Sequence, residues 1–158
     1  HGVMTKGLIQ ESGSFRSGPV GVVDKQGNIL HFGTLPDYAP GLTMELLEWI
    51  KESNIHMLIK SCVFHYELEV IHPFADGNGR IGRLIMFKEC LRHDVLPFIL
   101  DDKRRKGYLT GLREWDEDSY VLTEVILEAQ ERFSRQVALQ DLGEHRLDDL
   151  NDFDEEDW

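Results

Sequence analysis

The most constraining feature of this sequence is an apolar segment, residues 55–71, that runs directly into a His-Pro dipeptide. Apolar residues lie at helical spacing on several faces of the segment: Leu58, Ile59, Cys62, Val63, Tyr66 and Val70. A stripe this broad is typical of a helix buried on several sides. The helix must end near Ile71, because His72 precedes Pro73 and a residue before proline is pushed out of the α region. A glycine-rich turn and a second helix, at about residues 79–92, follow.

The remaining chain predicts a mainly α domain with one β-hairpin. Two β-branched runs within residues 18–34 flank a polar stretch, which is the pattern of a hairpin. Three more helices are expected, at about residues 43–53, 101–115 and 118–140. In the first of these we expect Thr43 as the N-cap and a buried stripe of Leu46, Leu47 and Ile50. In the last we expect Asp116 or Asp118 as the N-cap.

The size and charge of the chain limit its class. At 158 residues and 41% hydrophobic, it can bury one ordinary core, so we expect one domain over residues 1–140. Residues 141–158 hold nine acidic residues against Arg146, a net of −8 that leaves −4 of the total −12 for the rest. We interpret these residues as a solvated acidic tail. A nucleic-acid partner is unexpected, because binding a phosphate backbone needs an excess of basic residues on one face.

Two further observations bear on location. No run approaches the roughly 20 apolar residues that a membrane span requires, so no membrane partner is expected. Cys62 and Cys90 each lie in an apolar helical pattern, which favours buried free thiols in a reducing compartment over a disulfide scaffold. We therefore expect a cytoplasmic protein.

The stretch 72–83 has the local geometry of an anion site. It places a histidine at the abrupt end of one helix and a glycine turn at the start of the next. Gly77 and Gly79 allow positive φ angles and a close approach of backbone to ligand. The first N–H groups of the second helix lack helical partners and, together with the helix dipole, attract an anion.

Four side chains in this stretch add the chemistry of phosphoryl transfer. Asp76 is a hard oxygen ligand that could hold Mg²⁺ against phosphates. Arg80 and Arg83 are three residues apart, so both fall on one helical face and can reach the same anion. His72 titrates near neutrality and can accept a proton from an attacking hydroxyl. A histidine alone would more often be a structural residue, as we expect for His65; the setting of His72 favours a catalytic base.

Two better-known glycine patterns do not fit. Residues 77–82 satisfy G-x-G-x-x-G, but a dinucleotide fold needs a strand before this pattern, and here a long helix precedes it. A kinase glycine loop requires valine two residues after the last glycine, where this chain has Leu84. A basic run at residues 103–106 is most simply a solvated helix face.

The stretch 72–83 resembles the signature of the Fic family, H-P-F-x-D/E-G-N-G-R-x-x-R, at every defined position. Residues 65–71 resemble the helix before that signature, and Phe15-Arg16 with the hairpin resembles the family's flap region. Tyr108 and Leu112 resemble the helix that lines the nucleotide base pocket. The resemblance covers about residues 1–135 and implies a Fic-type helical domain with one β-hairpin flap.

The resemblance also implies an activity, the transfer of AMP from Mg-ATP to a Ser, Thr or Tyr hydroxyl of a target protein. His72 would be the general base, Asp76 the Mg²⁺ ligand and Phe74 an anchor of the loop in the core. The anion hole would be formed by Gly77, Asn78 and Gly79, with Asn78 on the α-phosphate. Arg80 and Arg83 would hold the outer phosphates, and Tyr108 would line the nucleotide site.

Partners are likewise implied by the resemblance. The hairpin at residues 18–34 would bind the target segment as an added strand. Family members are commonly silenced by a helix with the pattern S/T-x-x-x-E-G/N, whose glutamate pairs with the second arginine, here Arg83. That pattern does not occur in this sequence. Residues 5–10 resemble the end of a helix and the chain opens at His1 without a cap, so we expect an N-terminal portion upstream. The inhibitory helix would lie there, on a separate antitoxin-like chain, or nowhere.

Alternatives within and outside the fold stay open. Doc-type relatives transfer phosphate instead, but they carry lysine where this chain has Gly79. Transfer of UMP, GMP or phosphocholine is compatible with the same signature. A non-catalytic nucleotide-binding regulatory module would need neither His72 nor Asp76, so these two residues favour an enzyme.

Overall fold

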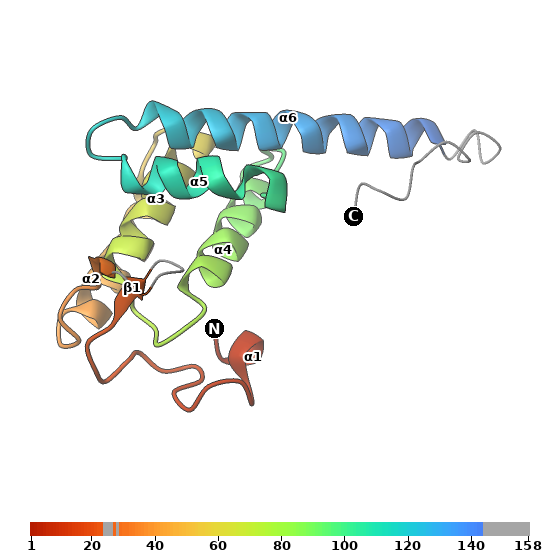
Figure 1. The fold of residues 1–158 in the computed structure, drawn as a ribbon. Coiled ribbons are helices and arrows are strands. Elements are labelled where there is room, and N and C mark those ends of the chain that lie inside the picture. The colour runs from red at the N-terminus through yellow and green to blue at the C-terminus, as the bar shows by residue number, and fades with distance from the viewer. Residues whose placement is uncertain (24–26, 28, 144–158) are drawn as a thin grey trace.

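A computed structural model describes residues 1–23, 27 and 29–143 of the chain, with the backbone alone for 30, 102 and 141–143 (Figure 1). The elements in chain order are α1 (Gly2–Thr5), β1 (Gly21–Val23), β2 (Ile29–Phe32), α2 (Ala39–Glu52), α3 (Met57–Ile71), α4 (Asn78–Arg92), a 3₁₀ turn (Asp102–Arg104), α5 (Arg105–Arg113) and α6 (Tyr120–Gly143). This confirms the predicted mainly α fold with one hairpin. The division between a domain and an acidic tail stays a prediction, because residues 144–158 lie outside the described residues.

Helix α3 is the centre of the core, as its apolar composition predicts. It packs against α2, α4 and α6, while α5 and α6 lie side by side across α3 and α4, away from the loop that joins these two helices (Figure 1). The buried apolar residues of α3 are Met57, Leu58, Cys62, Phe64, Leu68 and Ile71. Ile59 was expected in this set and is instead 48% exposed. One side of α3 faces solvent, and the sequence does not indicate this side because apolar residues occur on it too.

The predicted start of α2 is wrong, and α6 begins at Tyr120, two residues after the predicted start at 118. Helix α2 begins at Ala39, with Pro40 in its first turn, where the fixed φ of proline suits a helix start. Thr43 is therefore buried inside the helix, and its hydroxyl donates to the Ala39 carbonyl at 2.7 Å. Asp118 accepts the Tyr120 N–H at 3.0 Å at the start of α6.

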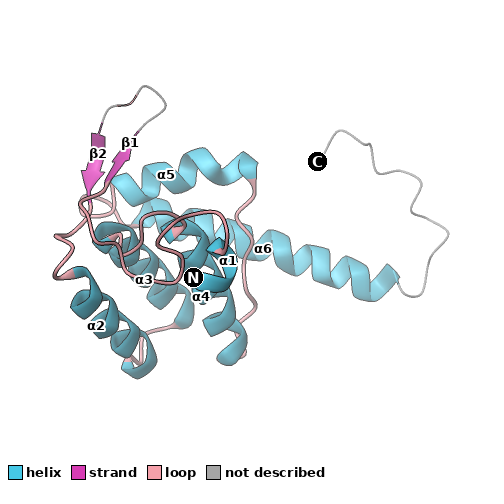
Figure 2. Cartoon of the chain, turned by 90° about the horizontal axis from the view of Figure 1, so that it is seen from below, coloured by secondary structure: helices cyan, strands magenta, loops and turns pink. Residues whose placement is uncertain are grey.

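The hairpin is shorter than the expected range 18–34. Strands β1 and β2 are antiparallel, with Gly21 opposite Phe32 and Val22 opposite His31, and they project away from the helices (Figure 2). The N–H of Gly33 still donates to the Val20 carbonyl at 3.1 Å just beyond the strands. Most of the turn predicted at residues 24–28 lies outside the described residues.

The prediction for the first residues is wrong. The helix there is α1, which ends at Thr5 where one was expected to run from 5 to 10. Gly7, with φ of 78°, lies in the turn that follows, a conformation that does not continue a right-handed helix.

The structure also describes the two cysteines and the length and polarity of the helices. Cys62 and Cys90 are buried free thiols, as predicted. Among the residues that the structure describes, no helix has both the length and the apolar character to cross a membrane.

Candidate active site at the α3–α4 junction

Helix α3 ends on His72, which adopts a left-handed conformation with φ 50° and ψ 59°. Its N–H closes the last helical turn by donating to the Leu68 carbonyl at 2.9 Å. Pro73 was expected to move His72 out of the right-handed helical region, and it does so, although into the left-handed region and not into an extended one. That conformation costs a non-glycine residue about 1–2 kcal/mol, so the surroundings must hold it in place.

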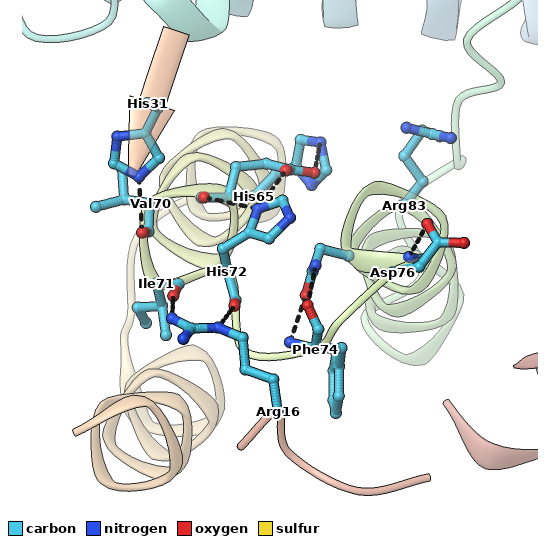
Figure 3. A network of polar contacts seen from close by, with 12 residues as sticks. Arg16, His31, His65, Val70, Ile71, His72, Phe74, Asp76 and Arg83 are labelled. Carbon is cyan, nitrogen blue, oxygen red and sulfur yellow. Dashed lines mark hydrogen bonds and ion pairs between the residues drawn. The ribbon is translucent and has the colours of Figure 1, made fainter. Parts of the chain in front are cut away.

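The imidazole of His72 is arranged as a neutral base (Figure 3). Its Nδ1 lies 3.3 Å from the Glu69 carbonyl oxygen, and because a carbonyl only accepts, Nδ1 carries the proton and Nε2 keeps its lone pair. Burial is the main cause that lowers the pKa of His72, and the charges of Arg16 and His31 add to this effect. The Glu69 carbonyl and Asp76 act in the opposite direction. A lowered pKa keeps the imidazole unprotonated near neutral pH.

The loop after His72 is held by its own side chains. Gly77 has φ of 85° and is the N-cap residue of α4, which explains why a glycine stands there. Asn78 is buried, and its amide accepts from the Phe74 N–H and donates to the Phe74 carbonyl, both at 2.9 Å. The Asn78 side chain was expected to reach a phosphate; in the structure it binds the loop backbone. Gly79, which could adopt a positive φ, lies in the helix without one.

Phe74 does not enter the helical core as expected. It is half-buried and stacks between two rings of the N-terminal segment, His1 at 3.9 Å and Phe15 at 5.6 Å between centroids. The loop is therefore anchored against the start of the chain. The sequence conceals this because a phenylalanine beside glycines carries no periodicity that names its neighbours.

Asp76 and Arg80 lie at the exposed lip of the loop. Oδ2 of Asp76 is 3.0 Å from the Arg80 guanidinium, and the two side chains are 62% and 45% exposed. Oδ1 accepts the Gly77 N–H at 2.6 Å. Among the described residues no cluster of three ligand side chains could hold a metal. One accessible carboxylate fits Mg²⁺, which binds through one or two carboxylates together with substrate phosphates.

Arg83 lies against α5, apart from the Asp76–Arg80 pair. Its Nη1 is 3.4 Å from the Tyr108 hydroxyl, and the guanidinium carbon is 5.8 Å from the centre of the Tyr108 ring. Arg80 and Arg83 were expected to reach the same anion, but in this structure they contact different residues, Asp76 and Tyr108. The Tyr108 hydroxyl also hydrogen-bonds Nε2 of His65, which is fully buried. His65 is thus structural, as predicted, and Tyr108 borders the site.

Sequence reasoning missed the role of Glu69 as the carboxylate between these groups. Its oxygens lie 3.7 Å from Nδ1 of His72 and 3.8 Å from Nε2 of His65. Burial raises the pKa of Glu69 to about 7, although the nearby Arg83 lowers it. A β-carbon built on Gly79 would lie 3.0 Å from Glu69 Oε1 and 3.1 Å from Arg83 Nη1, so a larger residue there would press on the ends of both side chains. Glu69 stands four residues after His65 and three before His72, and this helical spacing was the available signal.

Comparison with known proteins places this geometry in a family. The family model described as Fic/DOC matches residues 1–90, more than half of the chain. The chain belongs to the Fic/DOC family. The Fic/DOC match ends within α4, so it includes the hairpin, α2, α3 and the whole loop.

Named relatives and a solved structure agree with the Fic/DOC assignment. The chain is 36% identical over 95 residues to probable protein adenylyltransferase aq_aa38 of Aquifex aeolicus, covering 59% of this chain and 29% of that protein. It is 30% identical over 80 residues to protein adenylyltransferase fic-1 of Caenorhabditis elegans, covering 49% and 16%. A Fic family protein from Desulfovibrio desulfuricans superimposes with a TM-score of 0.73 at 33% identity, covering 89% of this chain and 45% of that one. This Fic/DOC chain therefore spans less than a third of the length of each of these two curated relatives.

Proposed function

We propose that this chain transfers AMP from Mg-ATP to a hydroxyl of a protein. One observation carries the proposal: His72, neutral and with Nε2 available, stands at the end of α3 beside the N-terminus of α4. A base and an anion site that face one loop suit the attack of a hydroxyl on a phosphate. The names of the relatives, protein adenylyltransferases, support AMP as the transferred group and ATP as its source.

The reaction follows from the positions of these groups. Nε2 of His72 accepts the proton of the target hydroxyl, and the hydroxyl oxygen forms a bond to the α-phosphorus of ATP. The bond from that phosphorus to the oxygen of the β-phosphate breaks, and pyrophosphate leaves. The first N–H groups of α4, with Arg80 and Arg83, bind the phosphate charge. Arg80 would exchange its contact with Asp76 for a phosphate.

Asp76 is the residue that would hold Mg²⁺. When bound, the ion neutralises charge on the phosphates as the pyrophosphate departs. Asp76 is suited to this task because its carboxylate is accessible and its second oxygen is fixed by the Gly77 N–H.

The partners in this proposal are a target protein and an inhibitor. The exposed edge of the hairpin around residues 18–34 would bind an extended segment of the target as an added strand. An inhibitory glutamate, supplied by an upstream helix or by an antitoxin-like chain, would pair with Arg83. In this proposal the protein acts in the cytoplasm.

The experiment incubates the chain with Mg²⁺ and ATP labelled on either the α- or the γ-phosphate, alone and with a cell lysate as a pool of acceptors. AMP transfer places the α-label on protein and leaves the γ-label free. Transfer of the γ-label would show phosphorylation instead, and parallel reactions with UTP and GTP test the choice of base. Intact mass spectrometry of the chain identifies the group added to itself.

His72→Ala is the decisive variant in this assay. We expect α-label incorporation to fall by about 10²–10⁴-fold, because a general base is lost. His93→Ala is the matched control, since His93 is exposed at the far end of α4 and pairs with Glu89. A folded His72→Ala protein that transfers AMP at the rate of the control would exclude the proposed mechanism.

A further inference from the structure

Arg16 is a buried cation in the segment before the hairpin. It is only 3% exposed, and its guanidinium donates to four main-chain carbonyls (Figure 3 shows two of them). The acceptors are His72 at 2.6 Å, Gly18 at 2.8 Å, Ile71 at 3.3 Å and Thr34. The main-chain N–H of Arg16 donates to the Pro73 carbonyl at 3.0 Å.

These acceptors belong to two structures that are far apart in the sequence. Ile71 is the last residue of α3, where the last carbonyls lack helical partners and carry the negative end of the helix dipole, and His72 and Pro73 follow it directly. Gly18 and Thr34 flank the two strands of the hairpin. One residue therefore binds both the end of the central helix and the base of the hairpin. A planar guanidinium with five donors suits this geometry.

The hairpin base also touches His72 directly. A β-carbon built on Gly33 would lie 2.9 Å from Cβ of His72 and 3.0 Å from Nη2 of Arg16. His31 of β2 also donates to α3, because its Nε2 lies 2.9 Å from the Val70 carbonyl oxygen, which can only accept. Hairpin base, Arg16 and His72 are thus in mutual contact.

Because Arg16 is buried, its charge must be stabilised by hydrogen bonds. A cation in the interior is tolerated only when its donors are satisfied, and here carbonyl oxygens satisfy them. One of these contacts, from Nε at 2.6 Å, is to the carbonyl of His72, the residue whose left-handed backbone needs support.

We propose that Arg16 is the positioning residue of this site: it fixes the left-handed backbone of His72 and sets the imidazole in register with the base of the hairpin. The proposal rests on the proposed function, in which His72 accepts the proton of a hydroxyl held beside the hairpin. Arg16 would then act on the transfer step and leave the binding of Mg-ATP, which depends on the loop and α4, nearly unchanged.

The test compares Arg16→Met, Arg16→Lys and the control Arg113→Met, whose parent side chain is 65% exposed and pairs with Glu114. Each variant is assayed for the rate of α-label incorporation at saturating Mg-ATP and, by calorimetry, for Mg-ATP affinity. A misplacement of about 1 Å costs roughly 10²-fold in rate, so we expect at least that loss in Arg16→Met with affinity within about threefold. Arg16→Lys, which keeps the charge and fewer donors, should recover part of the rate.

Equal rates in Arg16→Met and Arg113→Met would overturn the proposal. So would parallel losses of rate and ATP affinity, which indicate a merely structural role. If Arg16→Met does not fold, Arg16→Lys decides: a loss of tenfold or more with unchanged affinity supports positioning, and a rate equal to that of the control contradicts it.

An NMR measurement separates this proposal from the proposed function. The imidazole cross-peak of His72, assigned by its absence in His72→Ala, should move in Arg16→Lys and stay in place in Arg113→Met. This readout needs no transfer activity. If the parent chain transfers nothing, the proposed function fails, but the NMR result still tests the positioning role of Arg16. A cross-peak that moves in Arg16→Lys supports that role, and a cross-peak that stays in place rejects it.

Discussion

The contact between α5 and α6 gives a sharp prediction at Gly111. A β-carbon built on this residue would lie 2.6 Å from both Cα and N of Leu122 and 2.8 Å from its Cβ. These are backbone atoms of α6 and the first atom of a buried side chain, so they cannot swing aside. Gly111→Ala must therefore push α5 away from α6, and α5 carries Tyr108 at the edge of the candidate active site.

The size of the effect follows from two opposed terms. Alanine is favoured over glycine in a helix interior by about 1 kcal/mol. Overpacking a tight contact costs typically 1–3 kcal/mol, and a contact with backbone belongs at the upper end of that range. We expect a net loss of about 2 kcal/mol in the free energy of unfolding. For a chain of this size, about 2–4 °C in Tm corresponds to each kcal/mol, which gives a decrease of roughly 4–8 °C.

Gly107 is the matched control, one helical turn earlier in α5. A β-carbon there would meet only Val125 Cγ2, at 3.1 Å, and this methyl group can move. Gly107→Ala should leave Tm unchanged or raise it slightly, because the gain in helix propensity remains. Thermal unfolding followed by circular dichroism measures both variants under one condition. A Tm for Gly111→Ala equal to or above that of Gly107→Ala would refute the reasoning.

Two further predictions concern carboxylates at the candidate site. Asp76→Ala should weaken Mg-dependent ATP binding, because the accessible carboxylate of the loop is gone; equal calorimetric affinities for Mg-ATP in variant and parent would show that Asp76 is not the ligand. Glu69→Gln should change the pH dependence of stability: burial raises the folded pKa of Glu69 from 4.5 to about 7, so its contribution is full below about pH 4.5 and is lost as pH rises through 7. Glutamine does not titrate, so the variant does not lose this stability. Between about pH 4.5 and 7, its free energy of unfolding in urea should therefore rise relative to the parent by up to about 1.4 kcal/mol per pH unit. Parallel pH curves for the two proteins would contradict the raised pKa of Glu69.

Much of the fold could be predicted from local rules. The end of α3 at Ile71 follows from Pro73, and the start of α4 follows from the glycine turn, because both are effects of backbone sterics between near neighbours. The start of α2 was misplaced because Thr43 is a good cap by composition, although Pro40, whose fixed φ suits the first turn of a helix, was a local signal for the earlier start at Ala39.

The site was predicted by its motif and completed by contacts that cross long stretches of sequence. His72, Asp76 and Arg80 lie in the loop and at the helix ends that it joins, so their proximity could be inferred from the sequence. Arg16 reaches His72 over 56 positions, and no periodicity links the two. The Asn78 side chain was assigned to a phosphate by the family resemblance, yet the Phe74 backbone satisfies both its donor and its acceptor. Such choices depend on where the backbone already lies, which the residue type does not reveal.

The contact of Gly33 with His72 bears on how this hairpin can be exchanged between proteins. Loops that recognise a target are often transplanted to redirect an enzyme, with the strands and turn taken as the unit. Here that unit would be cut too short, since Gly18, Gly33 and Thr34 lie outside the strands and meet Arg16 or His72. A graft that keeps Arg16 and replaces residues 18–34 as a whole, with a glycine retained at 33, preserves the contacts that position His72. A graft of β1, the turn and β2 onto foreign flanks would carry the proposed recognition surface and misalign His72.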